Sequence, residues 1–103
     1  MVTMKIVPDG QFKRYELLDG GVFGGSALFD EDSASIISIS SESNIFWEGL
    51  FRAAVFCLLE RGEKTVLLPQ DIAEKAKKLG IIKMSADEEI SEEDIVSCPC
   101  HRA

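Results

Sequence analysis

The sequence holds few of the residues on which enzyme active sites most often depend. Among 103 residues there is one histidine, one tyrosine and one tryptophan. The single histidine, His101, stands close to the C-terminal end, so a histidine-based acid–base mechanism would have to use that end of the chain. Conventional hydrolase chemistry is therefore not expected.

Cysteine is also scarce, and three cysteines do not make a disulfide framework. Cys57 falls within an apolar stretch and is expected to be a small buried residue. Cys98, Cys100 and His101 form a Cys-Pro-Cys-His run that offers three possible metal ligands. A structural zinc site usually has four ligands, with wider spacing between its cysteines. A metal- or redox-responsive module is therefore one alternative, not the leading interpretation.

Long apolar runs and excess positive charge are both absent. No stretch approaches the roughly 20 apolar residues of a membrane helix, and Glu48 and Arg52 interrupt the most apolar one. Residues Met1 to Asp9 lack the apolar core of a signal peptide. The net charge of -7 opposes non-specific binding to nucleic acid, which needs lysine and arginine to neutralise phosphates. We expect a soluble cytoplasmic protein with neither a nucleic-acid nor a membrane partner.

The first half of the chain has the pattern of an antiparallel sheet. Phe12 to Leu18 and Gly21 to Phe29 read as strands around an Asp19-Gly20 turn, because Asp-Gly between apolar runs is a strong hairpin signal. Gly24 and Gly25 indicate a bulge in the second strand. The Ile-rich run from Ser35 to Ser41 is a third strand. Three antiparallel strands are therefore expected before the first helix.

That helix is predicted from Ile45 to Arg61, with Ser43 or Asn44 as its N-cap and Gly62 after its end. Nearly every position between these ends is apolar. The helix must therefore be covered on more than one side, by the sheet and by a second helix, a loop or another subunit.

A short strand from Lys64 to Leu68 and a second helix come next. Gln70 or Asp71 can cap this helix, and Gly80 is expected just past its end in a left-handed conformation. Ile81 to Met84 is a candidate final strand.

These elements predict one α+β domain over residues 1–84, with a mostly antiparallel mixed sheet and two main helices. Residues 85–103 are expected to be an acidic C-terminal tail or a short helix.

The two helices carry motifs that resemble a known family. Leu50-Phe51-Arg52-Ala53-Ala54, then Gly62, a strand and Lys78-Leu79-Gly80-Ile81 are similar to the second half of GNAT-type N-acetyltransferases. In that family the first helix commonly reads leucine-leucine-arginine-alanine-alanine, and the second ends in lysine-leucine-glycine-phenylalanine. The resemblance covers about half the chain and implies a GNAT-like fold.

The chain departs from this family where the chemistry takes place. Family members hold the cofactor pyrophosphate on glycines leading into the first helix, where backbone N–H groups meet the phosphates. Here Ile45 and Trp47 stand at those positions, and Glu42 upstream would repel phosphate. The tyrosine that serves as the family's general acid corresponds to Ala76. The resemblance therefore implies a shortened relative without catalytic activity.

The leading interpretation is a small interaction or regulatory module that has no cofactor and pairs with itself or with another protein. Core packing is the default expectation for the aromatic residues of the first helix. As the alternative, Trp47 and Phe51, four residues apart, form an exposed stripe that recruits a subunit. The alternative is an acyl-CoA-binding protein or weak N-acetyltransferase that holds acetyl-CoA or another acyl-CoA at an altered site near Ser43, Asn44 and Gln70. Whether the chain is an enzyme stays open between these two.

Overall fold

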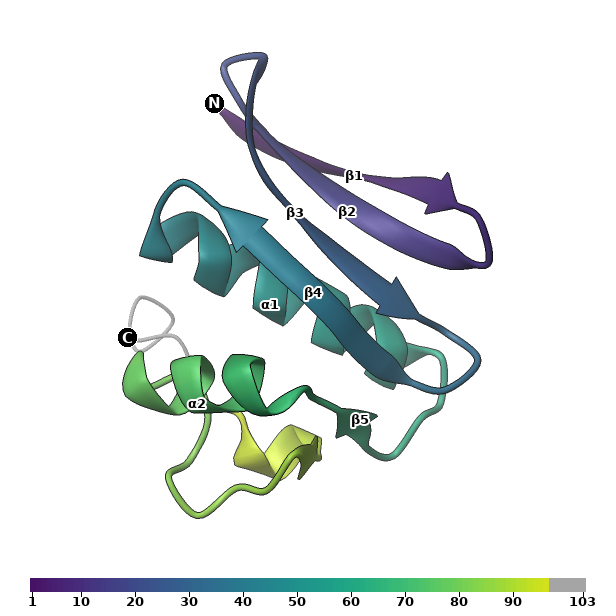
Figure 1. Cartoon of the computed structure of the whole chain (residues 1–103), viewed down its shortest axis with the longest axis vertical. Coiled ribbons are helices and arrows are strands. Elements are labelled where there is room, and N and C mark those ends of the chain that lie inside the picture. The colour runs from purple at the N-terminus through teal and green to yellow at the C-terminus, as the bar shows by residue number, and fades with distance from the viewer. Residues whose placement is uncertain (97–103) are drawn as a thin grey trace.

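The computed structural model, which describes residues 1–96, is an α+β fold with a six-stranded mixed sheet and two helices (Figure 1). The strands lie in the sheet in chain order from β1 to β6. The elements are β1 (Val2–Asp9), β2 (Phe12–Asp19), β3 (Val22–Asp30), β4 (Ser35–Ser41), α1 (Asn44–Glu60), β5 (Val66–Leu67), α2 (Gln70–Lys78), β6 (Glu89–Ile90) and the 3-10 helix η1 (Glu92–Asp94). Within the described part of the chain, no helix has the length and apolar character needed to cross a membrane.

Four antiparallel strands precede the first helix, one more than the sequence analysis expects. The additional strand, β1, pairs with β2 along its whole length, from Val2 opposite Asp19 to Asp9 opposite Phe12. The predicted Asp-Gly hairpin is confirmed, with Gly20 and Gly21 at positive φ between β2 and β3. The N-terminal half is therefore a continuous meander of hairpins.

The predicted bulge in β3 is confirmed at Gly24, where the register with β2 shifts. A Cβ atom on Gly24 would lie 2.9 Å from Leu17 Cδ2 and 3.0 Å from the Phe46 ring. A Cβ atom on Gly25 would lie 2.5 Å from the carbonyl oxygen of Ser40. These glycines let β4 and the start of α1 approach β3 closely.

The helix α1 crosses one face of the sheet and contacts β2, β3 and β4 (Figure 1). Of the two N-cap candidates, the structure selects Ser43, whose side chain accepts a hydrogen bond from the Phe46 N–H at 3.2 Å. The buried face of the helix supplies much of the core, and its residues are Trp47, Leu50, Phe51, Ala54, Val55 and Leu58.

The second half of the sheet begins with β5, which is shorter than expected. It lies parallel to β4, with a single residue pair, Ser35 opposite Leu67.

The second helix ends as expected, with Gly80 at a φ of +75°. The Ile81 N–H bonds to the Ala76 oxygen at 2.9 Å and the Gly80 N–H to the Lys77 oxygen at 3.0 Å, which is a Schellman motif.

This motif explains why the expected strand over Ile81 to Met84 is wrong. Because the Ile81 N–H closes the helix, it is not available to a neighbouring strand, and Ile82 forms only an isolated bridge to Ile95. The last strand is instead β6, which pairs with β5 through Ile90 opposite Val66. Ile90 is fully buried, so the acidic segment is held against the core while Glu88 and Glu89 stay exposed.

The contacts at two glycines predict opposite effects of adding one methyl group. The substitution Gly25→Ala should lower the free energy of unfolding by at least about 1–3 kcal/mol, because its Cβ meets a backbone oxygen that cannot move independently. The matched control Gly49→Ala, inside α1, places its Cβ 3.1 Å from the mobile end of Met4, and it gains up to about 1 kcal/mol of helix propensity. Urea unfolding of both variants measures the difference. Equal stabilities for the two would contradict this account of the bulge.

Candidate functional site

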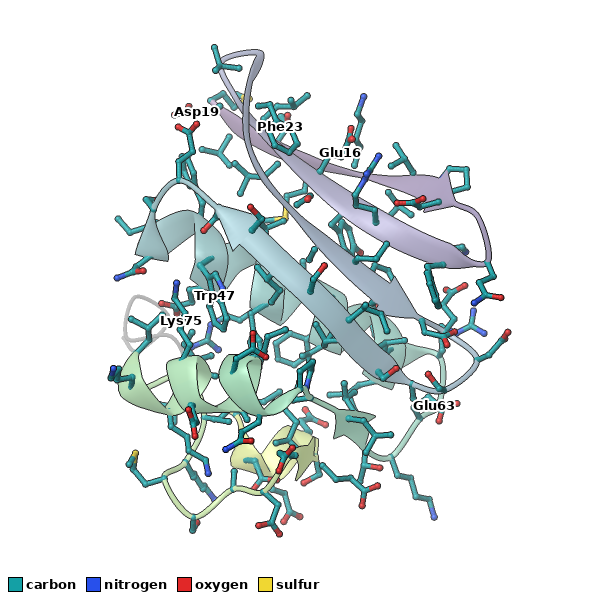
Figure 2. The ribbon with its side chains drawn as sticks, in the orientation of Figure 1. Glu16, Asp19, Phe23, Trp47, Glu63 and Lys75 are labelled. Carbon is teal, nitrogen blue, oxygen red and sulfur yellow. The ribbon has the colours of Figure 1, made fainter. Side chains whose placement is uncertain are left out.

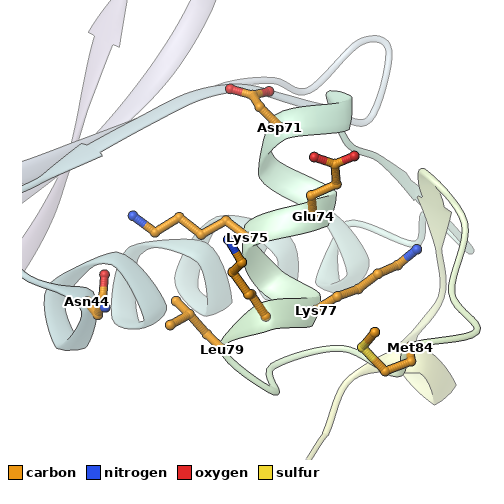
Figure 3. Close-up of a pocket in the computed structure, with 8 residues that line it drawn as sticks. Asn44, Asp71, Glu74, Lys75, Lys77, Leu79 and Met84 are labelled. Atoms are coloured by element: carbon orange, nitrogen blue, oxygen red, sulfur yellow. The ribbon is translucent and has the colours of Figure 1, made fainter.

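An open pocket of about 620 Å³ lies between the start of α1 and the last turns of α2 (Figure 3). Asn44 borders it from α1, Lys75, Lys78 and Leu79 from α2 and the residue after it, and Met84 from the following loop. Asp71, Glu74 and Lys77 complete its lining. The pocket thus combines a helix N-terminus, several lysines and a small apolar area.

The lysines of this pocket stand out in a chain with a net charge of -7. Lys75, Lys77 and Lys78 occupy the last turn of α2, where the negative end of the helix dipole favours positive charge. Within residues 1–96, none of these lysines forms an ion pair within 4.0 Å. These lysines are not among the site residues predicted from the sequence, although their position at the predicted helix end is a visible signal.

Lys75 also contacts the aromatic core. Its Nζ atom lies 5.1 Å from the centroid of the Trp47 ring, within the range of a cation–π interaction (Figure 2). Trp47 in turn stacks on Phe51, with ring centroids 5.5 Å apart and planes 10° from parallel. The indole therefore joins α1 to α2 beside Lys75, which borders the pocket.

This packing confirms core packing and shows that the alternative, an exposed aromatic stripe, is wrong. Trp47 is 3% exposed and Phe51 is fully buried. Both rings lie on the buried face of the helix, together with Leu50 and Ala54. Neither side chain is available at the surface to recruit a subunit.

The structure does not bring Ser43, Asn44 and Gln70 into one site. The Ser43 hydroxyl serves as the helix cap, and Asn44 borders the lysine-lined pocket. Gln70 borders a different pocket, of about 570 Å³, together with Leu67, Glu88 and Glu89, and its Nε2 donates to Glu74 Oε1 at 3.2 Å. The residues proposed for an altered acyl-CoA site therefore lie at the beginnings of two different helices.

No proton donor of the expected kind stands near these pockets in the described part of the chain. Ala76, at the position that corresponds to the family's catalytic tyrosine, is fully buried. The only tyrosine, Tyr15, lies on β2, where it stacks on Phe29 with centroids 5.6 Å apart. Burial, and then the charge and hydrogen bond of the neighbouring Cys57, raise the pKa of Tyr15 to about 12. This hydroxyl is a weaker acid than an ordinary tyrosine.

The proposed metal ligands Cys98, Cys100 and His101 lie outside the described residues. Among residues 1–96, no group of three or more histidine, cysteine, aspartate or glutamate side chains is arranged to hold a metal ion. The cysteine in this range, Cys57, is free and partly buried beside Tyr15.

Comparisons with protein-family models, with curated proteins and with solved structures found no match to this chain. The GNAT relationship therefore stays a prediction based on the helix motifs.

The environment of Tyr15 predicts a distinctive titration. The only tyrosine in the chain gives a single ultraviolet transition on ionisation, and we expect it with a pKa of about 12 in the folded protein. Because the folded pKa lies above the ordinary value near 10, the unfolded state loses this proton first. The contribution of Tyr15 to stability should therefore be complete below about pH 10 and decrease between about pH 10 and 12.

The variant Cys57→Ala provides the comparison. Removing the thiol should lower the pKa of Tyr15, but not fully to its ordinary value, because burial remains the larger cause. Absorbance at the phenolate band, followed against pH with circular dichroism as a check of folding, measures both transitions. An ordinary titration near pH 10 in the folded wild-type protein would contradict this environment.

Proposed function

We propose that this chain is a non-catalytic binding module with a GNAT-like core, which acts by contacting a partner. The observation that supports this most directly is the position of Trp47. Its ring is buried between α1 and α2, against Phe51 on one side and with Lys75 near its face. In the enzymes that the motifs resemble, glycines stand at the corresponding point and the backbone there approaches a cofactor pyrophosphate. The presence of a core-packed indole in place of a glycine supports the proposal that this chain has lost that loop.

The acid–base groups support the same proposal. Ala76 has no proton to give, and the raised pKa of Tyr15 makes it a poor donor at neutral pH. Exposed apolar side chains, in contrast, occur on β1 and at the beginning of β3, where Val2, Ile6, Val22 and Phe23 are each more than two-fifths exposed. Val2 and Ile6 share one face of β1, and exposed apolar side chains on a shared face favour protein contact. The proposal includes a cytoplasmic location, for which the acidic composition is the support.

An acyl-CoA-binding protein is the second candidate, and one observation favours it. The pocket beside the start of α1 carries Lys75 and Lys78 from the last turn of α2. A helix N-terminus with lysines beside it suits the phosphates of coenzyme A. In this candidate the chain binds the cofactor without the tyrosine acid that the family uses for transfer.

A thermal-shift titration separates the two candidates. Under the leading proposal, acetyl-CoA and free coenzyme A at roughly millimolar concentration should leave Tm unchanged. A ligand at a hundredfold excess over its Kd stabilises the native state by about 2.7 kcal/mol. In a domain of this size that free energy raises Tm by on the order of 10 °C. The two outcomes are therefore easy to distinguish.

The variant Lys78→Ala locates any shift that is seen. Lys78 is exposed and borders the pocket, whereas Lys64 is exposed and lies before β5, outside the pocket lining. A saturable shift that decreases in Lys78→Ala but persists in the control Lys64→Ala would establish the acyl-CoA candidate and overturn the leading one.

A further inference from the structure

The strand β1 forms one edge of the sheet, and within residues 1–96 it pairs with β2 alone. The Asp9–Phe12 pair closes a two-residue turn, and the Gly20 N–H donates to the Met1 oxygen at 2.9 Å. Residues opposite each other alternate between hydrogen-bonded and non-hydrogen-bonded pairs in an antiparallel ladder. The odd-numbered residues of β1 therefore bond to β2, while the backbone groups of Val2, Met4 and Ile6 point to the open edge.

The side chains of the same three residues form an apolar stripe. Val2 is 48% exposed, Met4 37% and Ile6 44%. The stripe lies on the α1 side of the sheet, since the end of Met4 is 3.1 Å from the point where a Cβ of Gly49 would stand. The helix packs mainly on β2 to β4 and reaches this outer strand at Met4, while Val2 and Ile6 stay more than two-fifths exposed. An open strand edge bordered by apolar side chains is a template for another strand.

Pro8 and Lys5 restrict which strand can pair there. Pro8 lies four residues after Met4, so its backbone also points to the open edge, but proline has no N–H to donate. Lys5 projects from the opposite face, where its Nζ lies 3.8 Å from Glu16 Oε1. An incoming strand must therefore bond mainly to Val2, Met4 and Ile6, and must not place a positive charge opposite Lys5.

We propose that the incoming strand is β1 of a second copy, paired antiparallel about a two-fold axis at Met4. This inference rests on the proposed function and names the partner of the binding module. In this register Met4 lies opposite the partner's Met4, and Val2 lies opposite the partner's Ile6. Every outward N–H of Val2, Met4 and Ile6 then has a carbonyl partner, and the two apolar stripes meet along their length.

Neighbouring registers are less favourable. An axis at Lys5 places the two Lys5 side chains directly opposite each other, and like charges in that position destabilise a strand pair. An axis at Ile6 places Met4 opposite the partner's Pro8, which cannot donate. The axis at Met4 instead places Lys5 opposite the partner's Thr3, with neither defect.

The charge distribution favours this edge over the opposite one. Residues Met1 to Pro8 contain no acidic side chain, whereas the edge at β6 carries Glu88, Glu89, Glu92 and Glu93. The two edges stand at opposite ends of the molecule (Figure 1). Pairing through β1 places the two acidic edges as far apart as the sheet allows. The contact is small, within the class below about 1,200 Å², so we expect a reversible dimer that depends on concentration.

Cysteine cross-linking tests the register. In a background of Cys57→Ala, Cys98→Ser and Cys100→Ser, the variant Met4→Cys should form a disulfide-linked dimer on mild oxidation. Residues opposite each other in hydrogen-bonded pairs have Cα atoms about 5.5 Å apart, within the range of a disulfide. Ile6→Cys alone should not cross-link, because two such residues are separated by roughly 13 Å along the strands. A mixture of Val2→Cys and Ile6→Cys should give the mixed dimer. Efficient cross-linking of Ile6→Cys alone would overturn the register.

Sedimentation equilibrium tests the dimer itself. The wild-type mass should rise towards twice the monomer with concentration, and Met4→Lys should remain monomeric. The matched control Met84→Lys introduces the same charge at a side chain 75% exposed and distant from β1, and it should dimerise like wild type. A monomeric wild type at all concentrations, or equal dimerisation of both lysine variants in folded form, would overturn the inference. If the wild type is monomeric and coenzyme A does not change its Tm, the dimer is wrong but the proposed non-catalytic module stands, with a different partner.

Discussion

The close approach of α1 to the bulged strand β3 is the contact on which the rest of this structure depends. Two glycines in β3 leave no room for a Cβ, and the Phe46 ring fills the space beside Gly24. The Ser43 cap defines where the helix begins. With this face of α1 packed on the sheet, Trp47 lies in the core, and α2 places Lys75 over its ring. The feature that argues against a cofactor loop is thus a direct consequence of core packing. A helix starting with glycines at this point would lose the indole that joins α1 to α2.

The sequence contained enough local information for the helices and hairpins, because caps and turns depend on a few neighbouring residues. Ser43, the Asp19-Gly20 turn and Gly80 stand where their chemistry predicts. The edge strands were harder. The alternation of Val2, Met4 and Ile6 with other residues, followed by the turn signal Asp9-Gly10, is the strand pattern that corresponds to β1, although no strand is predicted there above. The strand β6 has no clear pattern in the sequence, because it is only two residues long. Its position depends on the pairing of Ile90 with Val66, which is distant in sequence. The burial of Trp47 and Phe51 also required the tertiary arrangement, because helix periodicity alone does not decide which face meets the sheet.

The candidate site shows the same division between local and long-range information. Asn44 and Gln70 share a sequence signature as residues at helix starts, but in the fold the two helix starts border different pockets. The lysines of α2 acquire their possible role only when the fold places them beside Asn44. Their position at the helix C-terminus would stabilise the helix even without a ligand. The lysines are therefore compatible with either candidate function. The indole of Trp47 near the start of α1 distinguishes the two candidates better, because it stands where the acyl-CoA enzymes have a glycine.

The two edges of the sheet solve the same physical problem in different ways. Unpaired N–H and C=O groups on any edge invite another strand, and natural sheets protect them with short strands or charge. The β6 edge has both, since the strand spans two residues and is surrounded by glutamates. The β1 edge has an eight-residue strand with a single proline near its end and an apolar stripe beside it. Protection of only one edge restricts association to the other. In the proposed dimer, pairing through β1 would satisfy this edge in both copies, so the assembly would stop at two, with the protected β6 edges opposing further growth.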